Sequence, residues 1–236
     1  MEAPGMRRIA IIGIGGHGRE QLDLIAAINL VGRRYTVEGF VVDCEYAVAG
    51  DQVRGLPVHS GLDWIEARRE NVVAVCAIGD SARRARVVGR LQQAGVRFET
   101  LIHPAAIVSE SATISEGAIV CAGSILTTDV RVGAHVHIGV GSIVSHDCVL
   151  GEFASLAPGC RLAGTVHIGS GALLGIGTTI RDRVSVGAWS ITGAGTVVID
   201  DIPADSTVVG IPARVVATRQ PGWQQGEAHT TPESVP

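Results

Sequence analysis

The spacing of apolar residues changes near residue 106, which indicates two regions with different architectures. In the first region, segment 7–30 has the pattern of a strand, a glycine turn and an amphipathic helix. Segments 35–43 and 72–80 are predicted strands, and segment 81–95 is a predicted helix that ends on glycine. Alternating strands and helices predict a parallel sheet covered by helices.

From Ala106 onwards the apolar residues recur every six positions. Divided into sixes, the chain reads AIVSES, ATISEG, AIVCAG, SILTTD, VRVGAH, VHIGVG, SIVSHD, CVLGEF, ASLAPG, CRLAGT, VHIGSG, ALLGIG, TTIRDR, VSVGAW, SITGAG, TVVIDD. The third position is Val, Ile or Leu in fifteen of sixteen blocks, with Thr192 as the exception. The first position is small or β-branched, and the fourth is often glycine.

An α-helix cannot keep a period of six on one side, whereas strands with a corner after every sixth residue can. Positions one and three then point inward, because side chains two apart in a strand lie on the same face. The pattern predicts a parallel β-helix of roughly five coils, with three blocks to a coil.

Composition narrows the range of functions. The net charge is −4 and there is no basic run, which argues against nucleic acid or an anionic membrane as a partner. All nineteen basic residues are arginine, which excludes a Schiff-base lysine and a phosphate-binding Walker lysine. The 31 glycines and 3% aromatic residues are typical of a regular architecture of small side chains.

The five cysteines form no CxxC pair and no signal peptide is visible, so we expect reduced thiols and a cytoplasmic protein. The apolar stretch 9–14 is too short to span a membrane. We expect a Rossmann-like domain over 1–104, a β-helix over 105–218 and a disordered polar tail over 219–236.

The segment GSIVSHDCVLGEF, residues 141–153, places three reactive side chains side by side. Cys148 falls at position one of its block and Cys160 at the same position two blocks later, so both are predicted to be buried structural thiols. His146 and Asp147 fall at positions five and six, where side chains project outward from a corner. No metal site is expected there, because neither His135 nor His137 lies eighteen residues away.

A corner histidine is a candidate general base, since imidazole titrates near neutral pH and a neighbouring carboxylate can hold its other nitrogen. Gly164 lies eighteen residues after His146, one coil or roughly 4.8 Å along the stack. Its N–H could stabilise negative charge that develops on a ligand oxygen. On spacing alone, His146 could equally be a solvated surface residue.

Several motifs of this chain resemble those of bacterial sugar acetyltransferases, a family that includes sialic acid O-acetyltransferases and the N-acetyltransferases of bacillosamine and perosamine biosynthesis. The similarity extends over residues 7–216. It rests on GIGGHG at 13–18, GF and then Asp43 after the second predicted strand, IGD at 78–80, LIHPAA at 101–106, SHDCVLGEF at 145–153 and VVGIPARVV at 208–216.

The resemblance implies a left-handed β-helix in which His146 is the catalytic base, Asp147 orients it and the Gly164 N–H binds the acetyl thioester. It implies a homotrimer with coenzyme A between adjacent β-helices. On the spacing argument given above, we expect no metal. Residues expected near coenzyme A are Ser155, Gly164, Gly175, Ala194, Pro212 and Arg214, the last at the phosphates. Two positions depart from the family: Gly139 replaces a common asparagine, and Ser155 replaces a second histidine near the acetyl group.

The GIGGHG segment fits the GxGxxG pattern, in which backbone N–H groups and a helix terminus receive phosphate. Too few residues precede the β-helix for a dehydrogenase with its own substrate domain. We expect a nucleotide-sugar site, although His17 could be a surface turn residue without a role. The residues expected to line the site are Gly13, Gly15, His17, Gly18, Asp43 and Asp80.

The expected function is acetyl-CoA-dependent N-acetylation of a nucleotide-linked amino sugar. O-acetylation of a sialic-acid-type sugar is one alternative, because it would use the same base. A catalytically silent β-helix that serves as a binding module is the other, because Gly139 and Ser155 depart from the family pattern.

Overall fold

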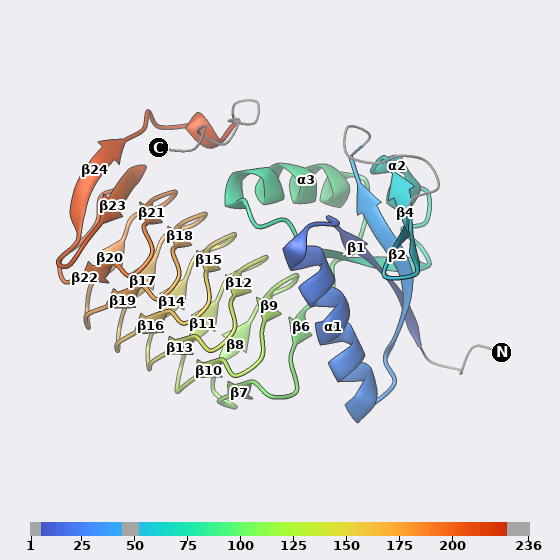
Figure 1. The fold of residues 1–236 in the computed structure, drawn as a ribbon, viewed down its shortest axis with the longest axis horizontal. Helices are drawn as coiled ribbons and strands as arrows, with labels where there is room; N and C mark the ends of the chain where they lie inside the picture. Colours follow the sequence, from blue (N-terminus) through green and yellow to red (C-terminus); the bar gives the residue numbers. More distant parts are fainter. Residues whose placement is uncertain (1–5, 44–51, 226–236) are drawn as a thin grey trace.

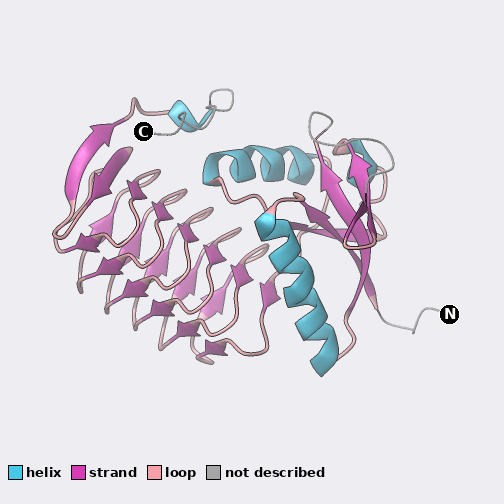
Figure 2. Ribbon diagram, viewed as in Figure 1, coloured by secondary structure: helices cyan, strands magenta, loops and turns pink. Residues whose placement is uncertain are grey.

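The computed structural model describes residues 6–43 and 52–225. An N-terminal α/β domain packs beside the first coils of a three-sided β-helix (Figure 1). The two long helices belong to the N-terminal domain, whereas the β-helix consists of short strands joined by turns (Figure 2). The two architectures predicted from the two periodicities are therefore confirmed.

The N-terminal domain follows the predicted order of strands and helices. Its sheet has the order β3-β4-β2-β1-β5, and neighbouring strands are parallel except for the β3–β4 pair. The β3–β4 hairpin was not predicted. The elements are β1 (Arg7–Ile12), α1 (Gly16–Val31), β2 (Tyr35–Val42), β3 (Gln52–Val53), β4 (Leu56–Ser60), α2 (Asp63–Glu66), β5 (Val72–Cys76) and α3 (Ser81–Gln93).

The β-helix has three sheets, which we name Faces I, II and III. Face I holds β6 (Leu101–Ile102), β9 (Ile119–Val120), β12 (His137–Ile138), β15 (Ser155–Leu156), β18 (Leu173–Leu174), β21 (Ile191–Thr192), β23 (Ser206–Val209) and β24 (Arg214–Thr218). Face II holds β7 (Ile107–Val108), β10 (Ile125–Leu126), β13 (Ile143–Val144), β16 (Arg161–Leu162), β19 (Thr179–Ile180) and β22 (Val197–Val198). Face III holds β8 (Thr113–Ile114), β11 (Arg131–Val132), β14 (Val149–Leu150), β17 (His167–Ile168) and β20 (Ser185–Val186).

Successive coils stack in a register of eighteen residues, so that Ile143 pairs with Arg161 and Val144 with Leu162. Side chains at block positions one and three fill the interior, as Cys148 and Val144 do at 0% exposure. The predicted inward positions are confirmed along the β-helix, where these residues form one continuous apolar cluster.

Each corner imposes two backbone requirements. The last residue of most blocks has positive φ, for example 58° at Asp147, a conformation that glycine, asparagine and aspartate tolerate best. The second requirement concerns position four, where glycine is needed because the next coil lies very close. A β-carbon at Gly151 would lie 2.6 Å from the backbone nitrogen of Ser170 in the next coil. Glycine there lets neighbouring coils approach closely.

The N-terminal domain covers the first coils of Face I. Ile119 of β9 shares an apolar cluster with Leu24 and Ile25 of α1. His137 and Ser155, which point outward from the next two coils, are also buried. In a three-sided prism, Face I lies opposite the corner between Faces II and III. The N-terminal domain and that corner are therefore on different sides of the β-helix.

Two boundaries differ from the sequence prediction. Strand β6 already pairs with β9, so Face I begins before the expected boundary at residue 105. The tail predicted to be disordered from residue 219 is ordered at first: a short 3₁₀ helix, η2 (Trp223–Gln225), packs against α3. Trp223 Nε1 donates to the Asp205 carboxylate at 3.0 Å, and Arg86 donates to the Gln224 carbonyl at 2.8 Å. Residues 226–236 of the predicted tail lie outside the described residues.

Candidate active site

His146 and Asp147 lie at the corner between Faces II and III, where their side chains are 62% and 57% exposed. The predicted outward orientation is confirmed. His146 Nδ1 is 2.7 Å from Asp147 Oδ2. Because an ionised carboxylate only accepts hydrogen bonds, Nδ1 carries the proton and Nε2 keeps a free lone pair. The pair can therefore act as a general base oriented by an acid.

Gly164 lies directly against His146 in the next coil, as the predicted register requires. It is buried where the imidazole covers it, and any β-carbon at this position would collide with that ring. Its C=O accepts from the Arg183 N–H at 3.0 Å, while its own N–H has no partner in the part of the chain that the structure describes. A main-chain donor beside a base is an arrangement that can stabilise a developing oxyanion.

Cys148 and Cys160 are fully buried, which confirms the prediction that they are structural. Their thiols lie 3.1 Å from the Ala163 carbonyl and 3.4 Å from the Gly175 carbonyl, respectively. Burial raises the pKa of both thiols, that of Cys160 to about 11. A thiol that stays protonated is a poor nucleophile.

A cavity of about 440 Å³ opens at the carboxyl ends of β1, β2 and β5. This is the edge at which parallel α/β sheets usually bind ligands, and the volume suits a nucleoside-sized group. Asp80 caps α3, where its carboxylate accepts from the Arg83 N–H at 2.6 Å. The lining residues are Ile12, Gly13, Ile14, Gly15, Val41, Val42, Asp43, Leu62, Ala77, Ile78, Gly79, Asp80, Arg83 and Val87.

Four of the six residues predicted for the nucleotide site line this cavity, and two do not. Gly13 has a φ of 105°, and Gly15 is the N-cap of α1 with open space around its Cα. Gly18 has a packing role instead, because a β-carbon there would collide with the Gly13 carbonyl. His17 turns away from the cavity, toward the β-helix.

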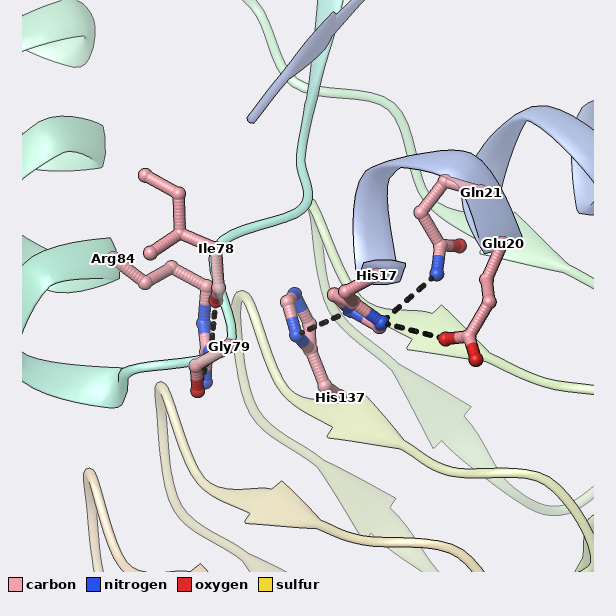
Figure 3. Close-up of polar contacts among 7 residues, drawn as sticks. All are labelled: His17, Glu20, Gln21, Ile78, Gly79, Arg84 and His137. Carbon is pink, nitrogen blue, oxygen red and sulfur yellow. Dashed lines mark hydrogen bonds and ion pairs between the residues drawn. The ribbon is translucent and has the colours of Figure 1, made fainter. Parts of the chain in front are cut away.

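His17 contacts His137 across the junction of the two domains (Figure 3). His17 Nε2 lies 3.1 Å from His137 Nδ1, and His17 Nδ1 lies 3.2 Å from the Glu20 carboxylate. The side chain of His17 is only 26% exposed. His17 is therefore part of the domain junction and is not a free surface residue.

A buried arginine fills the centre of the same junction. Arg84 of α3 donates to the carbonyls of Ile78 at 2.8 Å and Phe153 at 2.6 Å, and to Ser155 Oγ at 2.8 Å. It has no hydrogen bond to a carboxylate among the described residues. Burial lowers the pKa of Arg84 to about 10, so it remains charged at neutral pH.

The imidazoles around Arg84 are neutral for two reasons that act together. Burial, and then the charge of Arg84, lower the pKa of His135 to about 4 and that of His137 well below its ordinary value. Burial also lowers the pKa of His17, although Glu20 opposes the effect. The junction thus holds the positive charge of Arg84 and disfavours protonation of the histidines around it.

The residues expected to bind coenzyme A are spread over several parts of the β-helix. Gly175 and Ala194 lie at the corner between Faces I and II, and a β-carbon at Gly175 would lie 2.6 Å from the Thr192 carbonyl oxygen. Pro212 and the exposed Arg214 belong to the C-terminal end, where the Ile211–Pro212 peptide bond is cis. Ser155 is at the domain junction, where its hydroxyl also lies 3.2 Å from that of Ser81.

Within the described ranges, no group of three or more His, Cys, Asp or Glu side chains is arranged to hold a metal ion. The helices in those ranges are too short or too polar to cross a bilayer.

Comparisons with known proteins agree with this architecture. A family model described as the PglD N-terminal domain matches residues 8–91. A variant of the perosamine N-acetyltransferase from Caulobacter crescentus, solved with CoA and GDP-perosamine, is 32% identical with a TM-score of 0.80, over 91% of this chain and 98% of that one. The acetyltransferase domain of PglB from Neisseria gonorrhoeae, solved with acetyl coenzyme A, is 31% identical with a TM-score of 0.80, over 90% and 100%.

This chain belongs to the family of bacterial sugar acetyltransferases. Its β-helix is the left-handed hexapeptide type. The UDP-N-acetylbacillosamine N-acetyltransferase of Bacillus subtilis is 36% identical over 119 residues, which are 46% of this chain and 49% of that protein. The alignment thus spans about half the length of this curated relative.

The structure gives a physical context for both departures from the family pattern. A β-carbon at Gly139 would lie 2.7 Å from the Leu156 carbonyl oxygen and the Pro158 nitrogen, so this backbone has no room for a side chain there. Ser155 accepts a hydrogen bond from the buried Arg84 guanidinium at 2.8 Å, so its hydroxyl is engaged at the domain junction.

Acid is expected to destabilise this acetyltransferase through the buried imidazoles. The unfolded chain binds a proton at each histidine near pH 6.5, whereas folded His135 stays neutral down to about pH 4. The contribution of His135 to the free energy of unfolding should therefore be fully present above pH 6.5 and decrease as the pH drops toward 4. At pH 5 the loss from His135 alone should be about 2 kcal/mol. Urea unfolding at pH 7 and pH 5 measures this loss.

The variant His135→Asn provides the comparison, since asparagine tolerates the φ of 57° at this position. This variant should lose less stability between pH 7 and pH 5 than the wild type does. The same substitution at the exposed His167 should leave this loss equal to that of the wild type. Equal acid sensitivity of His135→Asn and wild type would contradict the assignment.

Arg84, Ser81 and His137 were missed by sequence reasoning. Arg84 looked like one of several arginines on an amphipathic helix, and His137 occupies an outward strand position that is usually solvated. Only the docking of the two domains buries them. The one available signal was that His137 points outward from a face that some other element has to cover.

Proposed function

We propose that this chain is an acetyl-CoA-dependent N-acetyltransferase that acts on a nucleotide-linked amino sugar. The observation that carries the proposal is the exposed His146–Asp147 pair lying against Gly164 at one corner of the β-helix. The cavity on the N-terminal domain supports a nucleotide-linked substrate. So does the similarity to N-acetyltransferases that were solved with CoA and GDP-perosamine.

The proposed reaction is direct transfer. The amine nitrogen of the sugar bonds to the thioester carbon, and His146 Nε2 takes a proton from that nitrogen. Asp147 accepts the hydrogen bond from Nδ1 and stabilises the imidazolium that forms. The N–H of Gly164 stabilises the carbonyl oxygen as negative charge develops. The carbon–sulfur bond then breaks, and His146 returns its proton to the thiolate of coenzyme A.

This reaction requires more than one copy of the chain. The cavity belongs to the domain that packs on Face I, whereas His146 is at the opposite corner. A nucleotide sugar held by one chain would therefore be acetylated by His146 of another. We propose a homotrimer of parallel β-helices, as the family resemblance implies.

An exposed apolar column offers a surface for this assembly. Val140 and Ile176 are 51% and 61% exposed at the corner between Faces I and II, with the exposed Pro158 in the coil between them and Ala194 above. Burial of such a column against a second copy is favourable, because it removes apolar surface from water.

Coenzyme A is proposed to lie in the groove between two adjacent β-helices. Gly164 would face the acetyl group from one chain, and Gly175 and Ala194 would face the pantetheine arm from the other. Pro212 and Arg214 would contact the nucleotide end, where the exposed guanidinium of Arg214 suits phosphate. A contribution of Ser155 to this site stays a prediction. The proposed location is the cytoplasm, where acetyl-CoA is available.

The proposal is tested by incubating the chain with acetyl-CoA and a panel of UDP-, GDP- and dTDP-linked amino sugars, with free sialic acid included, followed by mass spectrometry. One nucleotide amino sugar should gain an acetyl group. Acetylation of sialic acid alone would favour the O-acetyltransferase alternative. A binding module without activity would acetylate nothing, and acetyl-CoA would fail to raise its melting temperature.

A further inference from the structure

The contact between His17 and His137 links the glycine turn of the N-terminal domain to the β-helix (Figure 3). The proposed acetyl transfer does not use His137. Its ring lies on β12 of Face I, away from the corner that carries His146. The burial of this histidine under another domain therefore needs its own explanation.

The glycine turn has few side chains of its own to fix its shape. Gly15 is the N-cap of α1 and makes no side-chain capping bond, and the first turn of the helix contains no acidic residue. From Gly15 to Gly18, His17 is the only residue with a side chain. Glycine is the most flexible residue, so this segment depends on outside contacts to keep one conformation.

His17 supplies such a contact, and His137 is its partner. With Glu20 ionised, a neutral His17 carries its proton on Nδ1, which faces that carboxylate at 3.2 Å. His17 Nε2 then accepts from the Nδ1–H of His137 at 3.1 Å. Glu20 thus sets the tautomer of His17, and the contact with His137 fixes its position.

Burying His137 costs free energy, and packing alone does not explain why a histidine occupies this position. His137 is 5% exposed, and its Nε2 has no hydrogen-bond partner among the described residues. Burying an unpaired polar atom is unfavourable. Apolar residues occupy equivalent positions of Face I in other coils, such as Ile119 and Leu173. A leucine would therefore suit position 137 if it only had to fill space.

We propose that His137 is a positioning residue for nucleotide binding: its imidazole holds His17, and through it the first turn of α1 and the glycine turn, in the shape that receives the diphosphate of the nucleotide sugar. Gly13 and Gly15 of this turn line the cavity, and Gly15 is the N-cap of α1, so the N-terminus of this helix lies where it would receive a phosphate. The inference rests on the proposed function, because it assumes that a nucleotide binds in this cavity.

The matched variants are His137→Leu, which removes the hydrogen bond, and His137→Asn, whose amide can replace the Nδ1 group. His137→Gln is a second loss variant, because its amide extends toward the Nε2 position instead. His167→Leu is the control: His167 is exposed and occupies the same place in an identical Val-His-Ile-Gly segment. GDP, UDP and dTDP serve as probes in isothermal titration calorimetry with the full chain.

The expected result is a dissociation constant about five- to tenfold higher in His137→Leu and His137→Gln, as loss of one hydrogen bond predicts, with affinity restored in His137→Asn. With the amino-sugar nucleotide that the chain acetylates as substrate, the KM for that nucleotide should rise in the same ratio. The kcat and the KM for acetyl-CoA should stay unchanged. A purely structural role would reduce the fraction of folded enzyme, which lowers the apparent kcat and leaves both KM values unchanged.

Three outcomes separate failure of this inference from failure of the proposed function. If wild type binds GDP, UDP or dTDP, and His137→Leu and His137→Gln bind it equally well, His137 does not position the turn, and the proposed function stands. A folded His137→Asn as weak as His137→Leu would overturn the inference in the same way. If wild type binds none of GDP, UDP and dTDP, the nucleotide site itself fails, and the inference fails with it.

Discussion

Replacing His146 with alanine is expected to reduce kcat by about 10²–10⁴-fold, because the reaction then lacks the group that takes the proton from the attacking amine. The KM for acetyl-CoA should stay nearly unchanged, since the imidazole acts on the acceptor and contributes little to binding of the thioester. Steady-state kinetics with the amino-sugar nucleotide identified by mass spectrometry measures both quantities.

The control for this variant is His167→Ala, which removes another exposed histidine of the β-helix. It should keep the kcat of the wild type. Melting temperatures of both variants should match that of the wild type, because both side chains are exposed and fill no core. A His146→Ala variant that retained the wild-type kcat would refute the assignment of the base.

Replacing Gly164 with alanine is expected to reduce kcat by about 10²-fold through the position of the neighbouring imidazole. The new methyl group would occupy the place where the ring of His146 now lies. The main-chain N–H remains in this variant, so the loss would be due to displacement of the base. A displacement of about 1 Å from the productive position can have an effect of this size.

The fold should tolerate the Gly164→Ala substitution, since its new contact is with the end of an exposed side chain and the ring can turn away. The matched control is Gly89→Ala in α3, where the same methyl group meets nothing within 4 Å. Full activity of a folded Gly164→Ala variant would contradict the geometry proposed for the base.

The architecture and the orientation of the candidate base could be predicted because both depend on local periodicity. A repeat of six with strands of period two fixes which residues face inward, so Cys148 had to be buried and His146 had to be exposed. The register of eighteen residues also places Gly164 against His146, and it can be read from the spacing of the blocks alone.

The domain junction could not be predicted, because it is made of contacts between residues far apart in the chain. Arg84 contacts Phe153 and Ser155, and His17 contacts His137. No periodicity links these positions, and each residue type is common on a solvated surface. Their burial follows from how the N-terminal domain docks on Face I, which depends on the shapes of both surfaces.

The ordered start of the tail has a similar explanation. Its composition is typical of disorder, yet Trp223 donates to Asp205 and Arg219 stacks on the Trp223 ring with its guanidinium carbon 4.7 Å from the ring centroid. A few specific partners on the folded part of the chain are sufficient to order a segment that composition alone predicts to be disordered.

The most direct test is a crystal structure of the assembled protein with coenzyme A and the acceptor amino-sugar nucleotide bound. We predict that the sulfur of coenzyme A lies beside the Gly164 N–H of one chain. The amine of a nucleotide held in the cavity of a neighbouring chain should lie within hydrogen-bond distance of His146 Nε2, about 3 Å. Coenzyme A and the amine meeting at a site that His146 does not reach would contradict the account.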